Sequence, residues 1–411
     1  MAGEWHIHEW GEIASLEYGK SLRDYRSESG LYRVFGTNGP VGWHDVPLCQ
    51  HPGVIVGRKG AYRGIHYSKQ PFFVIDTAFY LEPKQTMDLR WAYYCLLTYD
   101  INGMDSGSAI PSTSREAFYR LPVRVPPLKE QQAIACILGA LDDKIELNRQ
   151  MNRTLEEMAR AIFKSWFVDF DPVRAKAAGR RPPGLKPEIA ALFPDSFEDS
   201  ELGKIPRGWS SIPLYDTASF INGAAFKGSD FCPPGEGFPV IKIAELKDGI
   251  SSQTKWSPRE AAPNQFINTG DLLYSWSGSP DTSLDAFLWT NNDGLLNQHI
   301  FKVVTPNIAQ KRFVYYLLKI LKPVLIEIAR NKQTTGLGHV TVADMKRLKV
   351  CSPSKTILYK FDSLIGSFFD RAFACLIENT TLAALRDTLL PKLISGELRV
   401  PDAERIAGRI L

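Results

Sequence analysis

The 411-residue sequence contains few cysteines and no long apolar run. Its six cysteines lie tens of residues apart, form no CxxC pair and have no histidine at the spacing of a zinc site. We therefore expect buried, reduced thiols and no metal centre. No stretch of about 18 apolar residues occurs, and the first residues lack the basic-then-apolar order of a secretion signal. These absences predict a soluble, cytoplasmic protein without a membrane partner.

The sequence also has no large excess of charge of one sign. The net charge is +4, and 44% of the residues are hydrophobic, which is enough to fill the cores of two or three domains. A mildly basic balance is compatible with a nucleic-acid partner but is far from the charge of a histone-like polyanion binder. Charge alone assigns no function.

Motifs of nucleic-acid enzymes are missing as well. The turn at 57–60 lacks the five-residue loop and the following Ser or Thr of a Walker motif. Methyl transfer to adenine would need a glycine-rich turn and an Asn/Asp-Pro-Pro-aromatic loop, of which Asp171-Pro172 is only a fragment. The acidic residues within 195–204 do not have nuclease spacing, and the histidines are dispersed. We expect no catalytic residues and no cofactor bound by this chain.

The two halves of the chain are copies of each other. The residues that recur at an offset of 227 (347 − 120) include Arg120 with Arg347, Leu121 with Leu348, Val123 with Val350, and Asn152 with Asn379. Toward the start of each half the offset falls to 204 (218 − 14), where Ala14 matches Ala218. Each half is therefore a front part that has diverged through insertions, followed by a back part copied without them.

The front parts are rich in short β-type runs that are separated by Gly, Pro, Asn and Ser. Such runs occur at 53–57, 72–75, 238–243 and 272–274. They predict two small mixed α/β domains with more strand than helix, at 1–125 and 206–353. The segment 169–205 between the halves is rich in Pro, Gly and charge, so we expect an inter-domain connection there.

The back parts, 126–168 and 354–411, predict one long helix each. A helix of about 40 residues is about 60 Å long, and one with a single apolar stripe is unstable alone, so the two helices should pair. Asn152 and Asn379 fall on the apolar seam, where polar residues fix register, although either could point to solvent instead. The predicted pairing residues are Leu138, Leu141, Ile145, Asn152, Leu155, Ile162, Ile365, Phe368, Asn379, Leu382 and Leu389.

Several segments of this chain resemble type I restriction-modification specificity subunits. They are Pro-Leu-Lys-Glu-Gln-Gln at 127–132, Leu-Asp-Asp-Lys-Ile-Glu-Leu-Asn at 141–148, Ala-Ile-Phe-Lys-Ser-Trp-Phe-Val-Asp-Phe-Asp-Pro-Val at 161–173, and Leu-Leu-Pro-Lys-Leu-Ile-Ser-Gly-Glu-Leu at 389–398. The second half departs from the pattern. Ser-Lys-Thr-Ile at 354–357 replaces the Pro-Leu-x-Glu-Gln start, and Ser-Trp-Ser-Gly at 275–278 replaces the Gly-Arg-Lys-Gly turn at 57–60.

The resemblance implies an α+β fold with two pseudo-symmetric, mixed α/β target-recognition domains. Each is followed by a long helix, and the helices pair as an antiparallel coiled coil. It also implies a non-catalytic subunit that binds a bipartite site in double-stranded DNA. The implied partners are two DNA-adenine methyltransferase subunits, which would carry S-adenosylmethionine, and motor-nuclease restriction subunits. A fused restriction-methylation enzyme with its own catalytic site and a coiled-coil scaffold with no DNA role remain alternatives.

DNA contacts should then come from loops of the two front domains. Basic side chains with tyrosines between them offer donors for phosphates and base edges beside stacking surfaces. For any single residue, an ordinary solvated side chain is at least as good an interpretation. The predicted DNA-binding residues are Arg58, Lys59, Tyr62, Arg63, Lys69, Lys227, Lys242, Asn331, Lys332, Gln333 and Thr334.

Overall fold

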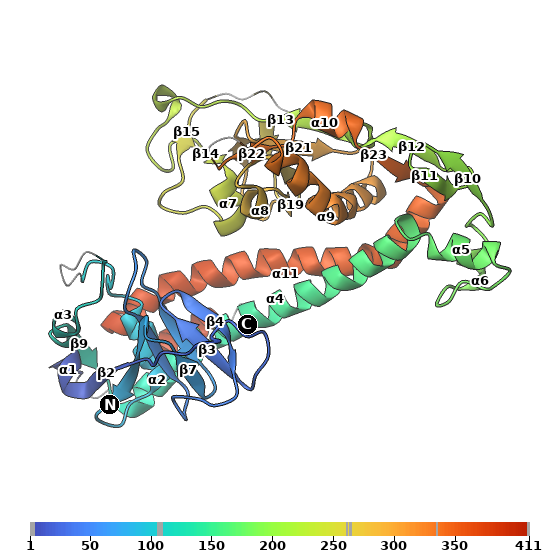
Figure 1. The fold of residues 1–411 in the computed structure, drawn as a ribbon. Helices are drawn as coiled ribbons and strands as arrows, with labels where there is room; N and C mark the ends of the chain where they lie inside the picture. The colour runs from blue at the N-terminus through green and yellow to red at the C-terminus, as the bar shows by residue number, and fades with distance from the viewer. Residues whose placement is uncertain (1–4, 105–109, 260–261, 263–264, 334–335, 409–411) are drawn as a thin grey trace. The chain divides into compact units, whose positions relative to one another are not determined.

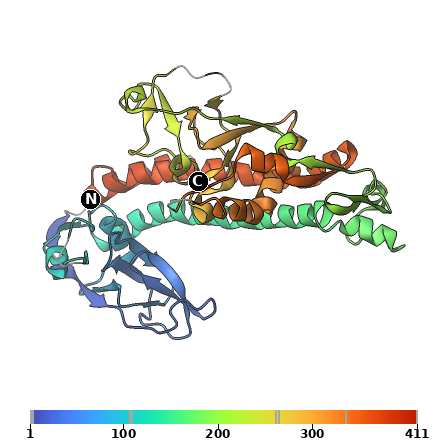
Figure 2. The same cartoon turned by 45° about the horizontal axis from the view of Figure 1, so that its top comes forward.

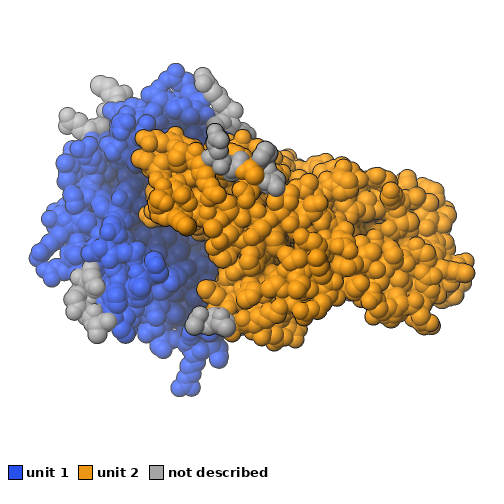
Figure 3. All heavy atoms as spheres, turned by 90° about the horizontal axis from the view of Figure 1, so that it is seen from above, with its two compact units in different colours: residues 1–146, 381–411 blue, residues 147–380 orange. Residues whose placement is uncertain are grey.

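The computed structural model describes residues 5–104, 110–259, 262, 265–333 and 336–408. The chain forms two compact units, which we call unit 1 (residues 1–146 and 381–411) and unit 2 (residues 147–380) (Figure 3). Two long helices, α4 (Leu128–Phe167) and α11 (Lys355–Ser395), contribute residues to both units. No helix in the described part of the chain has both the length and the apolar character needed to cross a membrane.

Unit 1 contains a four-stranded and a three-stranded sheet. The antiparallel sheet has the order β2-β8-β5-β6, and the smaller sheet has the order β4-β3-β7 with β3 parallel to β7. β5 is buried along its whole length because Val54 and Val56 pack into one core and Ile55 packs into another. The strands are β1 (His6–Glu9), β2 (Ala14–Tyr18), β3 (Tyr32–Gly36), β4 (Gly39–His44), β5 (Gly53–Gly57), β6 (Ile65–Ser68), β7 (Phe72–Val74), β8 (Ala78–Pro83) and β9 (Pro122–Val125).

Two of the short helices of unit 1 begin at a residue whose side chain caps them. The Asp88 side chain accepts from the Trp91 amide at the start of α2, and the Ser114 side chain accepts from the Ala117 amide at the start of α3. These helices are α1 (Trp10–Ile13), α2 (Leu89–Leu96), α3 (Arg115–Tyr119) and α12 (Val400–Ala407). α2 packs against β5 and β6 and joins the sheet to α4 in a single core.

Unit 2 repeats the main sheet of unit 1. Its antiparallel sheet has the order β13-β21-β17-β19, which matches β2-β8-β5-β6 strand for strand. In each front domain, a strand near its start also pairs with a strand near its end, β1 with β9 in unit 1 and β12 with β23 in unit 2. The two front domains are therefore pseudo-symmetric, as the repeat predicts.

The remaining strands and helices of unit 2 follow in chain order. The strands are β10 (Phe197–Ser200), β11 (Gly203–Pro206), β12 (Ser210–Pro213), β13 (Ser219–Asn222), β14 (Phe238–Ile241), β15 (Trp256–Ser257), β16 (Phe266–Ile267), β17 (Leu272–Ser275), β18 (Ser277–Gly278), β19 (Asp285–Leu288), β20 (Gly294–Leu296), β21 (Ile300–Val304), β22 (Gly338–His339) and β23 (Lys349–Ser352). The helices are α5 (Asp171–Ala177), α6 (Pro187–Ala190), α7 (Ile243–Asp248), α8 (Pro280–Ser283), α9 (Ile308–Arg330) and α10 (Val342–Arg347), with 3-10 turns at Leu214–Thr217 and Gly228–Asp230.

The segment 169–205 contains more regular structure than its composition suggested. It forms α5, α6 and the β10-β11 hairpin. Phe193 is 2% exposed, and its ring lies 4.9 Å from that of Trp166 at the end of α4. The Lys176 ammonium donates to the carbonyls of Ala190 and Phe193, so it closes the end of α6. This connection is thus packed onto the core of unit 2.

The predicted pairing of the two long helices is confirmed, and they lie side by side in both views (Figure 1 and Figure 2). The early part of α4 packs with the late part of α11 in unit 1, so the pair is antiparallel. The predicted pairing residues in the core of unit 1 are Leu138, Leu141, Ile145, Leu382 and Leu389. In unit 2, Ile365 is in the core, Ile162 and Phe368 pack against it, and Leu155 is half-buried.

The two seam asparagines have different surroundings. Asn379 Oδ1 accepts from Asn148 Nδ2 at 3.1 Å, and Asn148 also donates to Glu378 at 2.9 Å. Both side-chain polar atoms of Asn152 are buried, and neither has a hydrogen-bond partner among the described residues. Arg386 of α11 pairs with Asp142 of α4 at 2.8 Å in unit 1. The seam therefore contains one polar layer joined by hydrogen bonds, in which Asn148 Oδ1 alone has no partner among the described residues, and one asparagine, Asn152, whose side chain has none.

Candidate nucleic-acid interface

A short turn follows the buried strand β5 in unit 1. The amides of Arg58 and Lys59 both donate to the Thr77 carbonyl, at 3.0 and 3.1 Å. Both ends of the turn require glycine. A Cβ on Gly57 would lie 2.7 Å from a carbonyl oxygen, and Gly60 has a φ of +116°. The Gly-Arg-Lys-Gly sequence therefore holds two basic residues at the end of the sheet.

The same turn occurs in unit 2 with different side chains. The Trp276 amide donates to the His299 carbonyl at 3.3 Å, and the Trp276 carbonyl accepts from the Val340 amide at 2.9 Å. In unit 1, the Arg58 carbonyl accepts in the same way from Thr113, which lies 227 residues before Val340 (340 − 113). The departure of 275–278 from the Gly-Arg-Lys-Gly pattern is therefore a change of side chains on an equivalent backbone.

Arg58 belongs to a cation–π cluster on the surface of unit 1. Its guanidinium carbon lies 4.7 Å from the centroid of the Tyr18 ring, and that of Arg115 lies 5.0 Å from the same centroid. Tyr18 is 48% exposed. The cluster offers charged donors for phosphates or base edges beside an aromatic face. Sequence reasoning missed Tyr18 and Arg115 because they come from segments far from the turn.

The equivalent position in unit 2 is aromatic. Trp276 stacks on Phe301 with ring centroids 5.6 Å apart, and its indole N–H donates to Asn222 at 3.2 Å. The exposed His299 ring lies 5.7 Å from that of Trp276. Trp276 thus takes the place of Arg58 and offers stacking surface with little charge. The repeat offset could have pointed to this residue, but its type gave no sign of a DNA contact.

A second aromatic and basic cluster lies beside β14 in unit 2. The rings of Phe226 and Phe231 stack with centroids 6.4 Å apart. The Arg259 guanidinium carbon lies 5.5 Å from the Phe226 centroid, and the Lys242 ammonium lies 5.4 Å from the Phe231 centroid. Lys242 was predicted from the sequence, whereas Arg259 and the two phenylalanines were not. The cluster resembles the Arg58 cluster in its chemistry.

The structure separates the predicted residues of unit 1 by their exposure. Tyr62 is 78% exposed and Lys59 is half-buried in the turn. Arg63 is only 3% exposed, and its guanidinium donates to the carbonyls of Gly60 and Asn102 at 3.0 and 2.6 Å. The expectation that Arg63 contacts DNA does not fit this burial, because the side chain is used to hold the loop. Lys69 is exposed and forms an ion pair with Asp143 of α4.

The predicted residues of unit 2 are dispersed. Lys227 and Asn331 are exposed, and Gln333 donates to the Gly336 carbonyl at 2.7 Å. The Lys332 ammonium lies 2.6 Å from both carboxylate oxygens of the buried Asp344, so it stabilises the start of α10. Thr334 lies outside the described residues. Only Lys242 of the predicted residues in unit 2 takes part in an aromatic and basic cluster.

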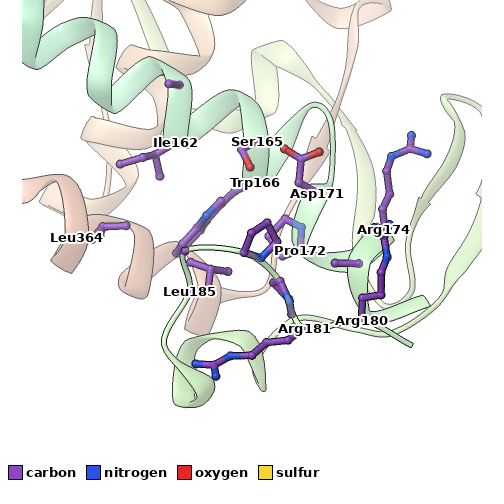
Figure 4. Close-up of a pocket in the computed structure, with 15 residues that line it drawn as sticks. Ile162, Ser165, Trp166, Asp171, Pro172, Arg174, Arg180, Arg181, Leu185 and Leu364 are labelled. Carbon is purple, nitrogen blue, oxygen red and sulfur yellow. The ribbon is translucent and has the colours of Figure 1, made fainter. Parts of the chain in front are cut away.

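A hollow of about 830 Å³ lies beside the end of α4 in unit 2 (Figure 4). Trp166, Ile162 and Leu364 line it together with Pro172 and Leu185, and arginines lie at its edge. Its lining residues, all of them described, include Asp171 and Ser165 but no histidine, cysteine or glutamate.

Burial shifts several titratable groups of the described chain. In that part of the chain, no three His, Cys, Asp or Glu side chains are placed to hold a metal ion. Burial raises the pKa of the Cys95 and Cys351 thiols to about 12, so both stay protonated at neutral pH and are poor nucleophiles. Burial also lowers the pKa of His66, which keeps its ring neutral.

Both halves of the chain match one sequence family. Residues 4–157 and 206–386 match the family described as Type I restriction modification DNA specificity domain. The chain belongs to this family. The two matched segments of this specificity-domain protein contain the two front domains and most of both long helices.

Specificity subunits of type I restriction enzymes are similar to it along most of their length. It is 27% identical over 375 residues to the HindI specificity subunit of Haemophilus influenzae, covering 79% of this chain and 81% of that protein. It is 25% identical over 330 residues to the MjaIX specificity subunit of Methanocaldococcus jannaschii, covering 78% of this chain and 71% of that protein. The crystal structure of the type I S subunit from M. genitalium matches with a TM-score of 0.60 and 19% identity, over 95% of this chain and 96% of that one, which shows a shared fold.

Proposed function

We propose that this chain is the DNA-specificity subunit of a type I restriction-modification enzyme and reads a bipartite site in double-stranded DNA. The observation that carries the proposal is the pair of equivalent turns at 57–60 and 275–278, one at the end of each main sheet. Two readers of the same build, joined by one pair of helices, would contact DNA at two places a fixed distance apart. Membership of the specificity-domain family supports the same conclusion.

The different side chains on the two turns favour two different half-sites. Arg58 and Lys59 can donate to the guanine O6 and N7 atoms or to phosphates, whereas Trp276 and His299 can stack and offer ring nitrogens. The half-site read by unit 1 should therefore depend more on salt than the half-site read by unit 2.

The chain would act through its partners. Two DNA-adenine methyltransferase subunits would assemble on the helices and hold S-adenosylmethionine, and motor-nuclease subunits would add restriction. In this proposal the chain itself has no catalytic residues and binds no cofactor, and it works in the cytoplasm, where the DNA is.

The test has two arms. In the first, the full chain is mixed with the methyltransferase subunits of its own system, and methylated sites are mapped on genomic DNA. We expect one bipartite motif with a fixed spacer. In the second, calorimetry with the chain alone should detect no S-adenosylmethionine binding. Random or absent methylation by an assembled complex would refute DNA recognition, and cofactor binding by the chain alone would favour the fused enzyme.

A further inference from the structure

An arginine of the front domain lies over a glycine of the long helix in unit 1. Arg90 of α2 donates through Nη2 to the Gly139 carbonyl at 3.0 Å and to Asp143 Oδ1 at 2.6 Å. Its Nη1 donates to Asp143 Oδ2 at 3.1 Å, so the carboxylate is held at both oxygens. The same carboxylate pairs with Lys69, which directly follows β6. This contact connects the front domain with one turn of α4.

Unit 2 contains a related constellation, in which one arginine bridges two carboxylates. Arg312 of α9 lies over Gly366 of α11 and pairs with Asp370 at 2.5 Å and with Asp362 at 2.7 Å. Gly366 follows Gly139 by 227 residues (366 − 139), and Asp370 follows Asp143 by the same offset (370 − 143). We call the two constellations the arginine clamps. They are Arg90, Gly139 and Asp143 in unit 1, and Arg312, Gly366 and Asp370 in unit 2.

Each glycine makes room for its arginine. A Cβ on Gly139 would lie 2.5 Å from Arg90 Cζ, and one on Gly366 would lie 2.9 Å from Arg312 Nη1. Glycine in a helix interior costs about 1 kcal/mol relative to alanine. That cost is present in both copies, at the place where a guanidinium must approach the helix backbone. The clamps thus explain the one glycine that interrupts the predicted first helix.

The clamps supply direction that the apolar contacts lack. In unit 1, Trp91 and Tyr94 of α2 share a core with Leu138 and Leu141 of α4. Burial of apolar surface has no preferred direction. Charge-assisted hydrogen bonds are directional, and Arg90 makes them to both oxygens of one carboxylate while Arg312 makes them to two carboxylates. A front domain displaced by one helical turn, about 5.4 Å, would keep much of its apolar contact but lose the clamp.

We propose that Arg90 and Arg312 are positioning residues that fix each front domain at one place on its helix and thereby set the spacer length of the DNA site. The inference rests on the proposed function. One base pair occupies about 3.4 Å along DNA. A domain free to shift by one helical turn would therefore accept spacers that differ by one or two base pairs. When both clamps are formed, the two front domains accept a site with one spacer length.

The test measures spacer selectivity in the full complex with the methyltransferase subunits. Duplexes carry the two half-sites with spacers from two base pairs shorter to two base pairs longer than the native one, and methylation of each is measured. Arg90→Met and Arg312→Met should each reduce the preference for the native spacer about tenfold and leave the half-site bases unchanged. The matched control is Arg120→Met, since the Arg120 side chain is 72% exposed and its ion pair is with Glu116, four residues earlier.

Gly139→Ala and Gly366→Ala test the same contacts in variants that are not expected to unfold. These variants leave every charge in place and raise helix propensity, but their Cβ atoms displace the guanidinium. The same loss of spacer selectivity is expected from them. If assembled glycine or arginine variants keep the native spacer preference, the inference is overturned and the proposed function stands. If the wild-type complex has no preferred spacer, the proposed function fails, and the inference fails with it.

Discussion

Replacing Asn152 with leucine should stabilise unit 2. Both polar atoms of the Asn152 side chain are buried without a hydrogen-bond partner among the described residues. The side chain borders a cavity of about 60 Å³ that is also lined by Leu288, Tyr315, Phe369 and Leu376. Leucine is larger than asparagine, and this cavity gives it room, so the substitution removes a buried polar group without overpacking the helix pair.

The expected gain follows from the missing hydrogen bonds. A buried polar group without partners costs about 1–3 kcal/mol, and Asn152→Leu removes that cost. For a unit of this size, each kcal/mol changes Tm by about 2–4 °C. We therefore expect Tm of the unit 2 transition to rise by several degrees.

Asn148→Leu is the matched control, four residues earlier on the same helix. Asn148 is fully buried, and its Nδ2 donates to Asn379 and Glu378, whereas its Oδ1 has no partner among the described residues. Its replacement should lower the free energy of unfolding by about 1–3 kcal/mol, because it removes the donor that Asn379 uses. The two substitutions have the same chemistry and should have opposite effects.

Differential scanning calorimetry of the full chain measures both variants, with the transition of each unit fitted separately because the protein has two units. An unchanged or lower Tm for Asn152→Leu would refute the reasoning, since it would mean that the Asn152 amide is satisfied in solution. The repeat offers a cross-check. The residue that corresponds to Asn148 is Cys375 (375 − 148 = 227), so Cys375→Asn should give Asn152 the partner that Asn379 already has.

Three further predictions concern DNA recognition. Changing Arg58, Lys59 and Arg115 together to alanine should weaken DNA binding and reduce its salt dependence. The slope of the logarithm of the binding constant against the logarithm of the salt concentration should fall by up to about 2.7, or about 0.9 per lost phosphate contact. An unchanged slope in filter binding would show that this cluster does not contact DNA. Deleting one heptad from the middle of both α4 and α11 should shorten the preferred spacer by about three base pairs, since seven residues span about 10 Å. Altered half-site bases in the methylation map would contradict that ruler role. Replacing residues 1–125 with the first front domain of another family member should give a hybrid site with one new half, and loss of both halves in an assembled complex would show that recognition is shared between the domains.

The sequence predicted the elements whose pattern is local or repeated. The run at 53–57 became β5 because it is a continuous apolar stretch between turn residues. The two long helices and their pairing followed from the apolar spacing and from the constant offset of 227 residues (379 − 152). The equivalence of the two front domains also followed from the repeat, although their strands differ in length.

The sequence did not predict contacts that depend on tertiary packing. Arg63 and Arg58 belong to the same basic stretch, but one is buried against carbonyls and the other lies over an aromatic ring at the surface. Composition cannot separate these two environments. The sequence also did not show how far α4 and α11 are shifted along each other. This shift places Asn379 against Asn148, whereas its counterpart Asn152 has no such partner. Residue types at the facing positions decided this difference, and the repeat alone does not give the facing positions.

The division of the chain into units has a consequence for how the protein is made on the ribosome. Unit 2 consists of the continuous residues 147–380, whereas unit 1 needs residues 1–146 together with 381–411. Leu382, Leu389 and Leu393 pack in one core with Ile134, Leu138 and Leu141, and they leave the ribosome only after all of unit 2 has been synthesised. During synthesis, the nascent chain must therefore carry the apolar face of Ile134, Leu138 and Leu141 without these leucines while unit 2 is completed. A release of the chain before residue 381 would leave it exposed, which makes premature termination a direct route to aggregation.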